Sequence, residues 1–356
     1  LKPSSSARRS LRPPGPVARP EIQRPGMLGQ LSRAGVGGTL VLGAGAWFAW
    51  YILVLRRAGT RAQPFGPQWL ATALSGVLFK FAHWYLTVSD NTKETAQVWE
   101  KQNLLVWHPH GAFTIAALYL FSYWSATDLE GKRGTHWCAV APLLLRIPGL
   151  AEFLLLCNAR SADSKTFNHL LSTGSSVAVQ PGGLREQVMT DAGQERVFFP
   201  AKLGFIRLAL RHGVRLVPAY CFGENQLYRT SEWVRRLNYW FYKHLGTGNL
   251  VVLGVGGIPN TPALPNPLML PVFRSGLHVR IGDPIEIAKD ENPSEEQVRE
   301  TFEKYLVGLR KLFDAHKDSC LPKEVAARGL EVVWPGFEKP KGEASGPPSA
   351  LGKSKM

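Results

Sequence analysis

Short apolar runs alternate with stretches of helical periodicity from about residue 90 onward. Turn residues bound each run, as is typical of buried strands, whereas apolar residues in the stretches between them recur at helical spacing. The predicted strands are 103–107, 176–180, 215–222, 249–253 and 277–281. The predicted helices are 112–125, 204–212, 231–244 and 294–317. Strands that alternate with helices predict an α/β fold with a mostly parallel sheet flanked by helices.

Two apolar segments precede this pattern. Residues 35–55 carry no charged side chain over 21 positions and are flanked by arginines. About 20 consecutive apolar residues span a bilayer as a helix, so this segment predicts a transmembrane helix. Residues 69–88 are rich in Trp, Tyr and Phe but interrupted by Lys80 and His83. Because Trp and Tyr favour membrane interfaces, this segment predicts a hairpin's second leg or a helix lying in the membrane plane.

The pattern divides the chain into four parts. We expect a disordered basic tail at 1–34, a membrane hairpin at 35–90, an α/β domain at 91–319 and a mobile tail at 320–356. The first part is rich in Arg, Pro and Ser and cannot bury enough apolar surface to fold. Its acid-poor composition is also typical of organelle transit peptides, although a basic tail near a membrane is the favoured interpretation.

The charge distribution changes the first impression that the composition gives. The chain has 356 residues and a formal net charge of +15, which by itself suggests a nucleic-acid partner. Residues 1–66 hold ten basic residues and one acid, whereas residues 67–315 hold 25 basic and 21 acidic residues. The folded part is therefore nearly balanced, and no zinc-finger or RNA-recognition motif supports nucleic-acid binding. The charge marks where the chain meets a membrane.

The strongest candidate for chemistry is a His-Pro-His-Gly sequence at the end of the first predicted strand. His108 and His110 flank Pro109, which fixes the backbone, and Gly111 permits a tight turn or a close approach of substrate. Open α/β sheets place their reactive groups at such strand ends. A neutral imidazole can remove a proton from a hydroxyl, as acyl transfer to an alcohol requires. The alternatives are two structural histidines at a turn, or a metal pair that would need further ligands.

A Pro-Gly-Gly loop follows the predicted strand 176–180. The backbone N–H groups of Gly182 and Gly183 can face an oxyanion or a phosphate. The guanidinium of Arg185 can contact a phosphate, and Glu186 can orient a histidine or bind a polar head group. Because Pro-Gly-Gly alone is a common turn, these roles depend on the loop meeting the two histidines.

A third polar pair follows the predicted strand 215–222. Glu224 and Asn225 stand just past this strand, at the sheet edge where the other two loops are expected to converge. Polar residues at such a position can contact a substrate or cap the helix that follows.

Together these segments resemble the type-2 diacylglycerol acyltransferase family, which includes monoacylglycerol and wax-alcohol acyltransferases. The motifs follow the family's order over about residues 100–317. They are HPHG, PGG with an acid three residues later, a Gly-Phe to Phe-Gly-Glu-Asn run at 204–225, and a Gly-Asp-Pro-Ile turn at 282–285. The resemblance implies a glycerolipid-acyltransferase-like fold and transfer of a fatty acyl group from acyl-CoA to diacylglycerol, giving triacylglycerol. Acyl-CoA is then a substrate, and no cofactor is expected.

The resemblance also assigns residue roles. It implies that His108 and His110 are the catalytic pair and that Glu186 is a catalytic acid of the PGG loop. Lys202 stands where the family usually carries Arg, so its role in binding an anion is less fixed in geometry. The expected substrate-binding residues are Pro109, Gly111, Gly182, Gly183, Arg185, Lys202, Glu224 and Asn225.

Partners and location follow from the same resemblance. The expected partners are acyl-CoA, diacylglycerol and a lipid bilayer, with no nucleic acid and no metal, and the sequence does not indicate an oligomeric state. The expected location is the endoplasmic reticulum membrane or lipid droplets, or a plastid membrane if the leader is a transit peptide. Monoacylglycerol and long-chain alcohols stay open as acceptors, as does the choice of base between the two histidines. A membrane lipid-binding protein without activity is the non-enzymatic alternative.

Overall fold

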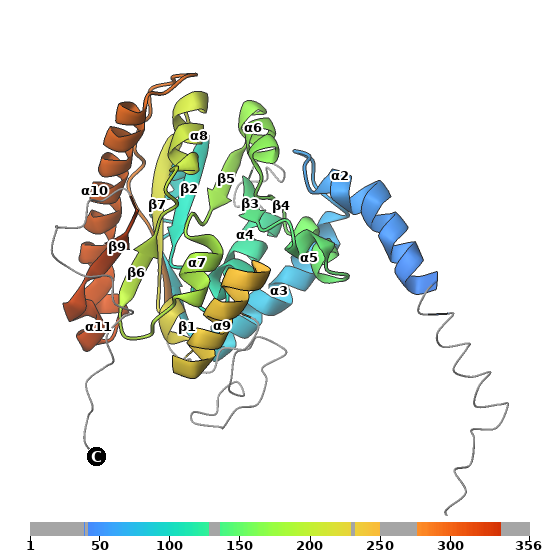
Figure 1. Cartoon of the computed structure of the whole chain (residues 1–356), viewed down its shortest axis with the longest axis horizontal. Coiled ribbons are helices and arrows are strands. Elements are labelled where there is room, and N and C mark those ends of the chain that lie inside the picture. Colours follow the sequence, from blue (N-terminus) through green and yellow to red (C-terminus); the bar gives the residue numbers. More distant parts are fainter. Residues whose placement is uncertain (1–38, 40–41, 128–135, 229–231, 250–275, 336–356) are drawn as a thin grey trace, which may run out of the picture. The chain divides into compact units, whose positions relative to one another are not determined.

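The computed structural model describes Thr39 and residues 42–127, 136–228, 232–249 and 276–335 (Figure 1). The chain divides into two units, Leu1–Trp50 and Tyr51–Met356. Residues 42–50 of the first unit are helical. The second unit begins with η1 (Tyr51–Leu55) and α2 (Arg56–Ala58) and contains all the elements discussed below.

Seven strands from the described residues form the main sheet, in the order β1-β8-β7-β2-β5-β3-β4. Neighbouring strands are parallel except β7 and β8, which are antiparallel. The strands are β1 (Thr87–Asp90), β2 (Asn103–His108), β3 (His136–Val140), β4 (Ala159–Ser161), β5 (Ser176–Val179), β7 (Arg215–Phe222) and β8 (Gly276–Ile281). The predicted mostly parallel sheet is therefore confirmed.

Helices cover both faces of this sheet because its strands alternate their apolar side chains. In β2, Leu104 and Val106 join one core with α6 (Ser164–Ser172), α8 (Gly204–His212) and α10 (Glu295–Cys320). Leu105 and Trp107 join the opposite core with α3 (Gln68–Tyr85), η3 (Ala116–Phe121) and the sheet strands β7 and β8. Burial of both faces is what parallel sheets require. The remaining helical segments are η2 (Ala96–Val98), α4 (Ser122–Thr127), η4 (Leu144–Arg146), α5 (Leu150–Leu156), α7 (Gly183–Val188), η5 (Glu224–Gln226) and α9 (Glu232–Leu245).

A second sheet changes the expectation for the C-terminal part. Where the sequence predicted a mobile tail from residue 320, α11 (Lys323–Arg328) follows α10, and β9 (Leu330–Val333) pairs in parallel with β6 (Glu195–Phe198). Leu321, Val325 and Ala326 are buried in the core, which explains why this stretch is folded. The rest of the predicted tail, residues 336–356, lies outside the described residues.

The predicted elements differ from the observed ones mostly next to loops. The strand 215–222 and the helix 204–212 are confirmed at both ends by β7 and α8. The helix expected at 112–125 begins later, because residues 112–114 are not helical and the helical segment starts at Ile115. Of the strand expected at 249–253, only Asn249 is described, and it lies outside any strand.

The two predicted membrane segments are described by the structure to different extents. The segment 69–88 forms most of α3 and then enters β1. The segment 35–55 includes positions outside the described residues, and its described part consists of Thr39, the helical residues 42–50 and η1. In the part of the chain that the structure describes, no helix has both the length and the apolarity needed to cross a bilayer.

Candidate active site

Three loops meet at one edge of the main sheet. β2 lies between β5 and β7 and is parallel to both, so the carboxyl ends of the three strands point the same way. His108 is level with Tyr220 in the register of β2 and β7. The HPHG turn follows β2, α7 follows β5, and η5 follows β7. The predicted convergence of these loops is confirmed.

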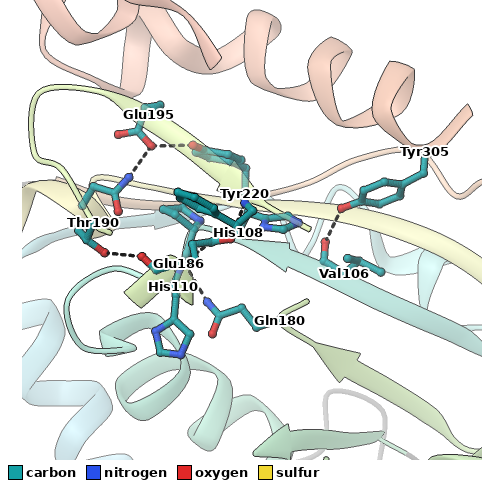
Figure 2. Close-up of polar contacts among 12 residues, drawn as sticks. Val106, His108, His110, Gln180, Glu186, Thr190, Glu195, Tyr220 and Tyr305 are labelled. Atoms are coloured by element: carbon teal, nitrogen blue, oxygen red, sulfur yellow. Dashed lines mark hydrogen bonds and ion pairs between the residues drawn. The ribbon is translucent and has the colours of Figure 1, made fainter. Parts of the chain in front are cut away.

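The carboxylate of Glu186 on α7 joins these elements (Figure 2). It is almost fully buried. Its Oε2 lies 3.3 Å from Nδ1 of His108 and accepts a hydrogen bond from the backbone N–H of Phe198 at 3.0 Å. Its Oε1 accepts a 2.6 Å hydrogen bond from the backbone N–H of His110. One charged group therefore fixes the HPHG turn, the PGG helix and the end of β6, and these bonds satisfy it in the interior.

His108 is the anchored member of the histidine pair. Its side chain is fully buried at the end of β2, and its ring meets the ring of Phe199 edge-on at 5.0 Å between centroids. With Nδ1 facing Glu186, its Nε2 is buried and has no hydrogen-bond partner among the described residues. The second nitrogen thus keeps an unengaged lone pair or proton inside the core.

His110 is half-buried, and its ring is directed away from Glu186 (Figure 2). Its Nδ1 lies 3.0 Å from Oγ1 of Thr114. Burial lowers the pKa of His110 below its usual 6.5, and the nearby charge of Glu186 opposes this only in part. At neutral pH the ring is therefore uncharged and able to accept a proton.

The two glycines of the PGG loop have different roles. A Cβ on Gly182 would lie 1.9 Å from Oε2 of Glu186, so only glycine leaves room for that oxygen. Gly183 has a φ of +50°, and its backbone N–H donates to the carbonyl of Gln180 at 3.3 Å. Since that N–H is already engaged in the turn, the structure gives no support to the expected oxyanion role of Gly183.

Glu224 lies behind the HPHG turn and has no exposed surface. It accepts hydrogen bonds from the backbone N–H groups of Ile115 at 2.6 Å and Ala116 at 3.0 Å, so it caps the helical segment that follows the turn. Gly111 has a φ of +64°, and a Cβ there would lie 2.6 Å from Cγ of Glu224. Burial raises the pKa of Glu224 to about 8, although the two N–H bonds lower it. Glu224 therefore holds the turn from the interior, and its expected contact with substrate stays a prediction.

Asn225 contacts a buried acid, Glu195, that the sequence did not indicate as a site residue. Its side chain is buried, and its Nδ2 donates to Oε2 of Glu195 at 3.0 Å. The hydroxyl of Tyr220 donates to the same oxygen at 2.6 Å, and Gln226 donates to Oε1 at 2.8 Å. Burial raises the pKa of Glu195, which has no exposed surface. A single acid at the start of a four-residue strand gives no sequence signal for this network. Asn225 supports the network, and its expected contact with substrate stays a prediction.

Of the other predicted binding residues, Pro109 is buried in the HPHG turn, whereas Arg185 and Lys202 are exposed. The carbonyl of Pro109 accepts a 2.9 Å hydrogen bond from Gln180. Arg185 is exposed, with its guanidinium 5.3 Å from the centroid of the Phe198 ring. Lys202 is exposed in the turn before α8, and its carbonyl accepts from Arg207. Over the residues that the structure describes, no group of three or more His, Cys, Asp or Glu side chains could hold a metal ion.

Comparisons with known proteins extend over most of the chain. A family model described as diacylglycerol acyltransferase matches residues 40–326. The chain is 33% identical to acyl-CoA wax alcohol acyltransferase 2 of Mus musculus over 61% of this chain and 66% of that protein. It is 30% identical to 2-acylglycerol O-acyltransferase 1 of Bos taurus over 59% of this chain and 64% of that protein.

Two further proteins are similar to the chain. The chain is 30% identical to diacylglycerol O-acyltransferase 2 of Xenopus laevis over 59% of this chain and 60% of that protein. The matched region thus covers less than two thirds of the length of these relatives. The crystal structure of a 1-acyl-sn-glycerophosphate acyltransferase from Thermotoga maritima aligns with a TM-score of 0.41 and 14% identity, over 69% of this chain and 79% of that one.

Proposed function

The chain belongs to the diacylglycerol acyltransferase family, and we propose that it moves a fatty acyl group from acyl-CoA to the free hydroxyl of diacylglycerol at a membrane. The products are triacylglycerol and free CoA. The observation that carries the proposal is the convergence of the HPHG turn and the PGG helix on the buried carboxylate of Glu186. The names of the relatives include acyl transfer to wax alcohols, 2-acylglycerols and diacylglycerol, which supports the reaction class.

His110 is the general base in this proposal. Its ring is half-buried at the margin of the site and uncharged at neutral pH, so an acceptor hydroxyl can reach a nitrogen that takes up a proton. His108 is fully buried and packed against Phe199, so a lipid hydroxyl would have to displace the core to meet its Nε2. His108 therefore holds Glu186 in place, and Glu186 holds the backbone of His110.

The reaction needs no covalent intermediate on the enzyme. The His110 ring removes the hydroxyl proton as the hydroxyl oxygen of the acceptor forms a bond to the thioester carbonyl carbon. The tetrahedral intermediate then collapses, the carbon–sulfur bond breaks, and CoA leaves as a thiolate. The imidazolium returns the proton to this sulfur, so the enzyme regains its starting state. The nearby negative charge of Glu186 favours the transient imidazolium.

The membrane setting is part of the proposal, because diacylglycerol stays in the bilayer. Trp69 and Trp84 lie near the two ends of α3 and are at least 70% exposed, and Val77 between them is 66% exposed. Tryptophans at the ends of an exposed apolar helix face suit the interface between water and lipid. Together with the uncharged segment 35–55, this face supports anchoring in the endoplasmic reticulum or at lipid droplets. Fractionation of cells that express a tagged chain tests that location.

An assay that offers three acceptors in parallel identifies the acceptor that the chain uses. Microsomes that contain the chain receive labelled oleoyl-CoA together with diacylglycerol, monoacylglycerol or a long-chain alcohol. The proposal predicts that labelled triacylglycerol is the main product. A label that appears mainly in diacylglycerol or in wax ester would show that the acceptor is monoacylglycerol or a long-chain alcohol. The reaction class, acyl transfer from acyl-CoA, would stay the same. Binding of these lipids without transfer to any acceptor would contradict the enzyme assignment.

A further inference from the structure

Helix α9 presents large apolar side chains to solvent. Trp233 is 55% exposed, Trp240 is 51% exposed and Leu245 is 59% exposed. Trp233 and Trp240 are seven residues apart and lie on one face, whereas Val234 and Asn238 are buried on the opposite face. Within the described residues, the ring contacts of Trp240 are to Phe241 and His244 of the same helix. An exposed face of this kind is typical of an interaction surface.

The inner side of α9 is joined to the candidate active site. Helices α7 and α9 pack against each other, and α7 carries Glu186. Just after α9, the side-chain amide of Asn249 donates to the carbonyl of Ala112 at 3.0 Å and to that of Gln187 at 3.2 Å. Gln187 also donates to the Ala112 carbonyl at 3.0 Å. Because Ala112 follows the HPHG sequence directly, whatever α9 binds is held next to the catalytic turn.

The charges on α9 indicate the chemistry of its partner. Arg236 and Lys243 are exposed beside the two tryptophans. Lys243 lies 5.4 Å from the centroid of the Tyr239 ring, and Arg236 pairs with Glu232 one turn earlier. Tryptophan flanked by long basic side chains suits a lipid interface, where the ring enters the head-group region and the cation meets phosphate. Protein interfaces are instead depleted in lysine.

We propose that the outer face of α9 docks on the surface of an anionic lipid bilayer, so that the acceptor enters the active site beside this helix. The inference deepens the proposed function and rests on it, because it names the face through which the membrane substrate arrives. From Trp233 to Leu245 the helix is about 18 Å long, enough to lie along the surface rather than to cross it.

Photo-crosslinking of the full chain tests the docking itself. The substitution Trp240→p-benzoylphenylalanine is made in chain reconstituted into vesicles of phosphatidylcholine and phosphatidylserine. Val307 is the matched control position, because it is 69% exposed and lies on α10, which packs on the sheet face opposite α3. We expect lipid adducts at position 240 and none at position 307. Adducts to a second copy of the chain, or no lipid adduct at 240, would overturn the proposal.

An activity assay separates docking from catalysis. The double variant W233E/W240E should lose about tenfold or more of its transfer to diacylglycerol in vesicles, because acidic residues oppose insertion at an anionic surface. Its transfer to a short-chain diacylglycerol dissolved as monomers should be unchanged, and V307E should match the wild type on both. Equal losses on both acceptors would refute docking as the role of this face. If the wild type transfers to neither acceptor, the proposed function fails, while the crosslinks still decide the docking.

Discussion

The interior of the active site and the outer faces of α3 and α9 reverse the usual distribution of residues. Inside, the carboxylates of Glu186, Glu195 and Glu224 are almost fully buried. Outside, four tryptophans, Trp69, Trp84, Trp233 and Trp240, are half or more exposed. Charged side chains are rarely buried without partners, and large exposed aromatic faces mark interaction sites. Both departures from the usual distribution of residues occur in one chain, whose expected substrate is a lipid.

The two regions are stabilised by different means. Each buried carboxyl group accepts hydrogen bonds from backbone N–H groups or side-chain donors, which offset the cost of removing a polar group from water. The exposed tryptophans are proposed to meet a lipid surface outside the protein. Changes in the interior should therefore disturb the site geometry or the folding free energy, whereas changes on the outer faces should act only when lipid is present.

The largest expected effect separates the two histidines. The variant H110A should lose about a hundred- to ten-thousandfold of its acyl transfer with little change in thermal stability, because general-base assistance is worth that much and the ring is half-buried. The variant H108A should instead lower the free energy of unfolding by about 2–4 kcal/mol, because it leaves a cavity and removes the side-chain partner of the buried Glu186 carboxylate. Steady-state rates and thermal melts measured together check both. A stable H108A that is inactive, beside an active H110A, would reverse the assignment.

Gly182 offers a steric test of the interior. In the variant G182A the new methyl group would meet Oε2 of Glu186 at 1.9 Å, so the carboxylate must move away from His108. Gly182 has a φ of −67°, so alanine adds no backbone strain there. We expect at least about a tenfold loss of transfer, since small displacements of positioning groups are costly. Gly204 is the matched control, because nothing lies within 4 Å of a Cβ there and its φ is not in the left-handed region. Unless G204A retains full activity and G182A does not, the packing argument fails.

Glu224 makes the interior sensitive to pH. Its pKa is about 8 in the folded chain against an ordinary 4.5, so between these values the folded state holds a proton that the unfolded state releases. Its contribution to stability is therefore full below about pH 4.5, falls as the pH rises, and is gone above about pH 8. The variant E224Q lacks this dependence. Relative to the wild type, its free energy of unfolding should rise by up to about 1.4 kcal/mol per pH unit from pH 5 to 8. A constant difference in urea titrations would show that Glu224 is not protonated on folding.

The smallest effect concerns the outer face of α3. The double variant W69A/W84A removes two side chains that are at least 70% exposed, so its thermal stability in detergent should change by less than about 0.5 kcal/mol per site. Its transfer to diacylglycerol in vesicles should fall a few-fold. A loss of stability as large as that of a core variant would show that this face is packed against other parts of the protein. The outer face of α3 would then not differ from the interior in the way proposed.

The sequence carried enough information to predict the central sheet and the meeting of the loops. Strand β2 and strand β7 are continuous apolar runs, and parallel strands bring their carboxyl ends to one edge, so His108 and the PGG loop had to converge. The four-residue strands β6 and β9 are too short to give a clear period and pair only through tertiary contact. That pairing also explains why the chain stays folded beyond Cys320.

The roles inside the site were less predictable. Glu224 and Asn225 stand at a strand end, where polar residues can point to a substrate or to the interior, and nothing in the local sequence decides between them. Only the fold shows that Glu224 meets the N–H groups after the HPHG turn and that Asn225 meets Glu195. The partner of a buried charge is set by long-range packing, which a local pattern does not contain.

The most direct test of the central claim follows both products of the reaction for the wild type and E186Q. Purified chain in diacylglycerol-containing vesicles receives labelled oleoyl-CoA, and labelled triacylglycerol and free CoA are counted together. The wild type should form them in a one-to-one ratio. E186Q should lose about a hundredfold or more of both, because the amide cannot supply the charge that holds the HPHG turn. Label released only as free fatty acid, or an E186Q rate close to that of the wild type, would contradict acyl transfer at this site.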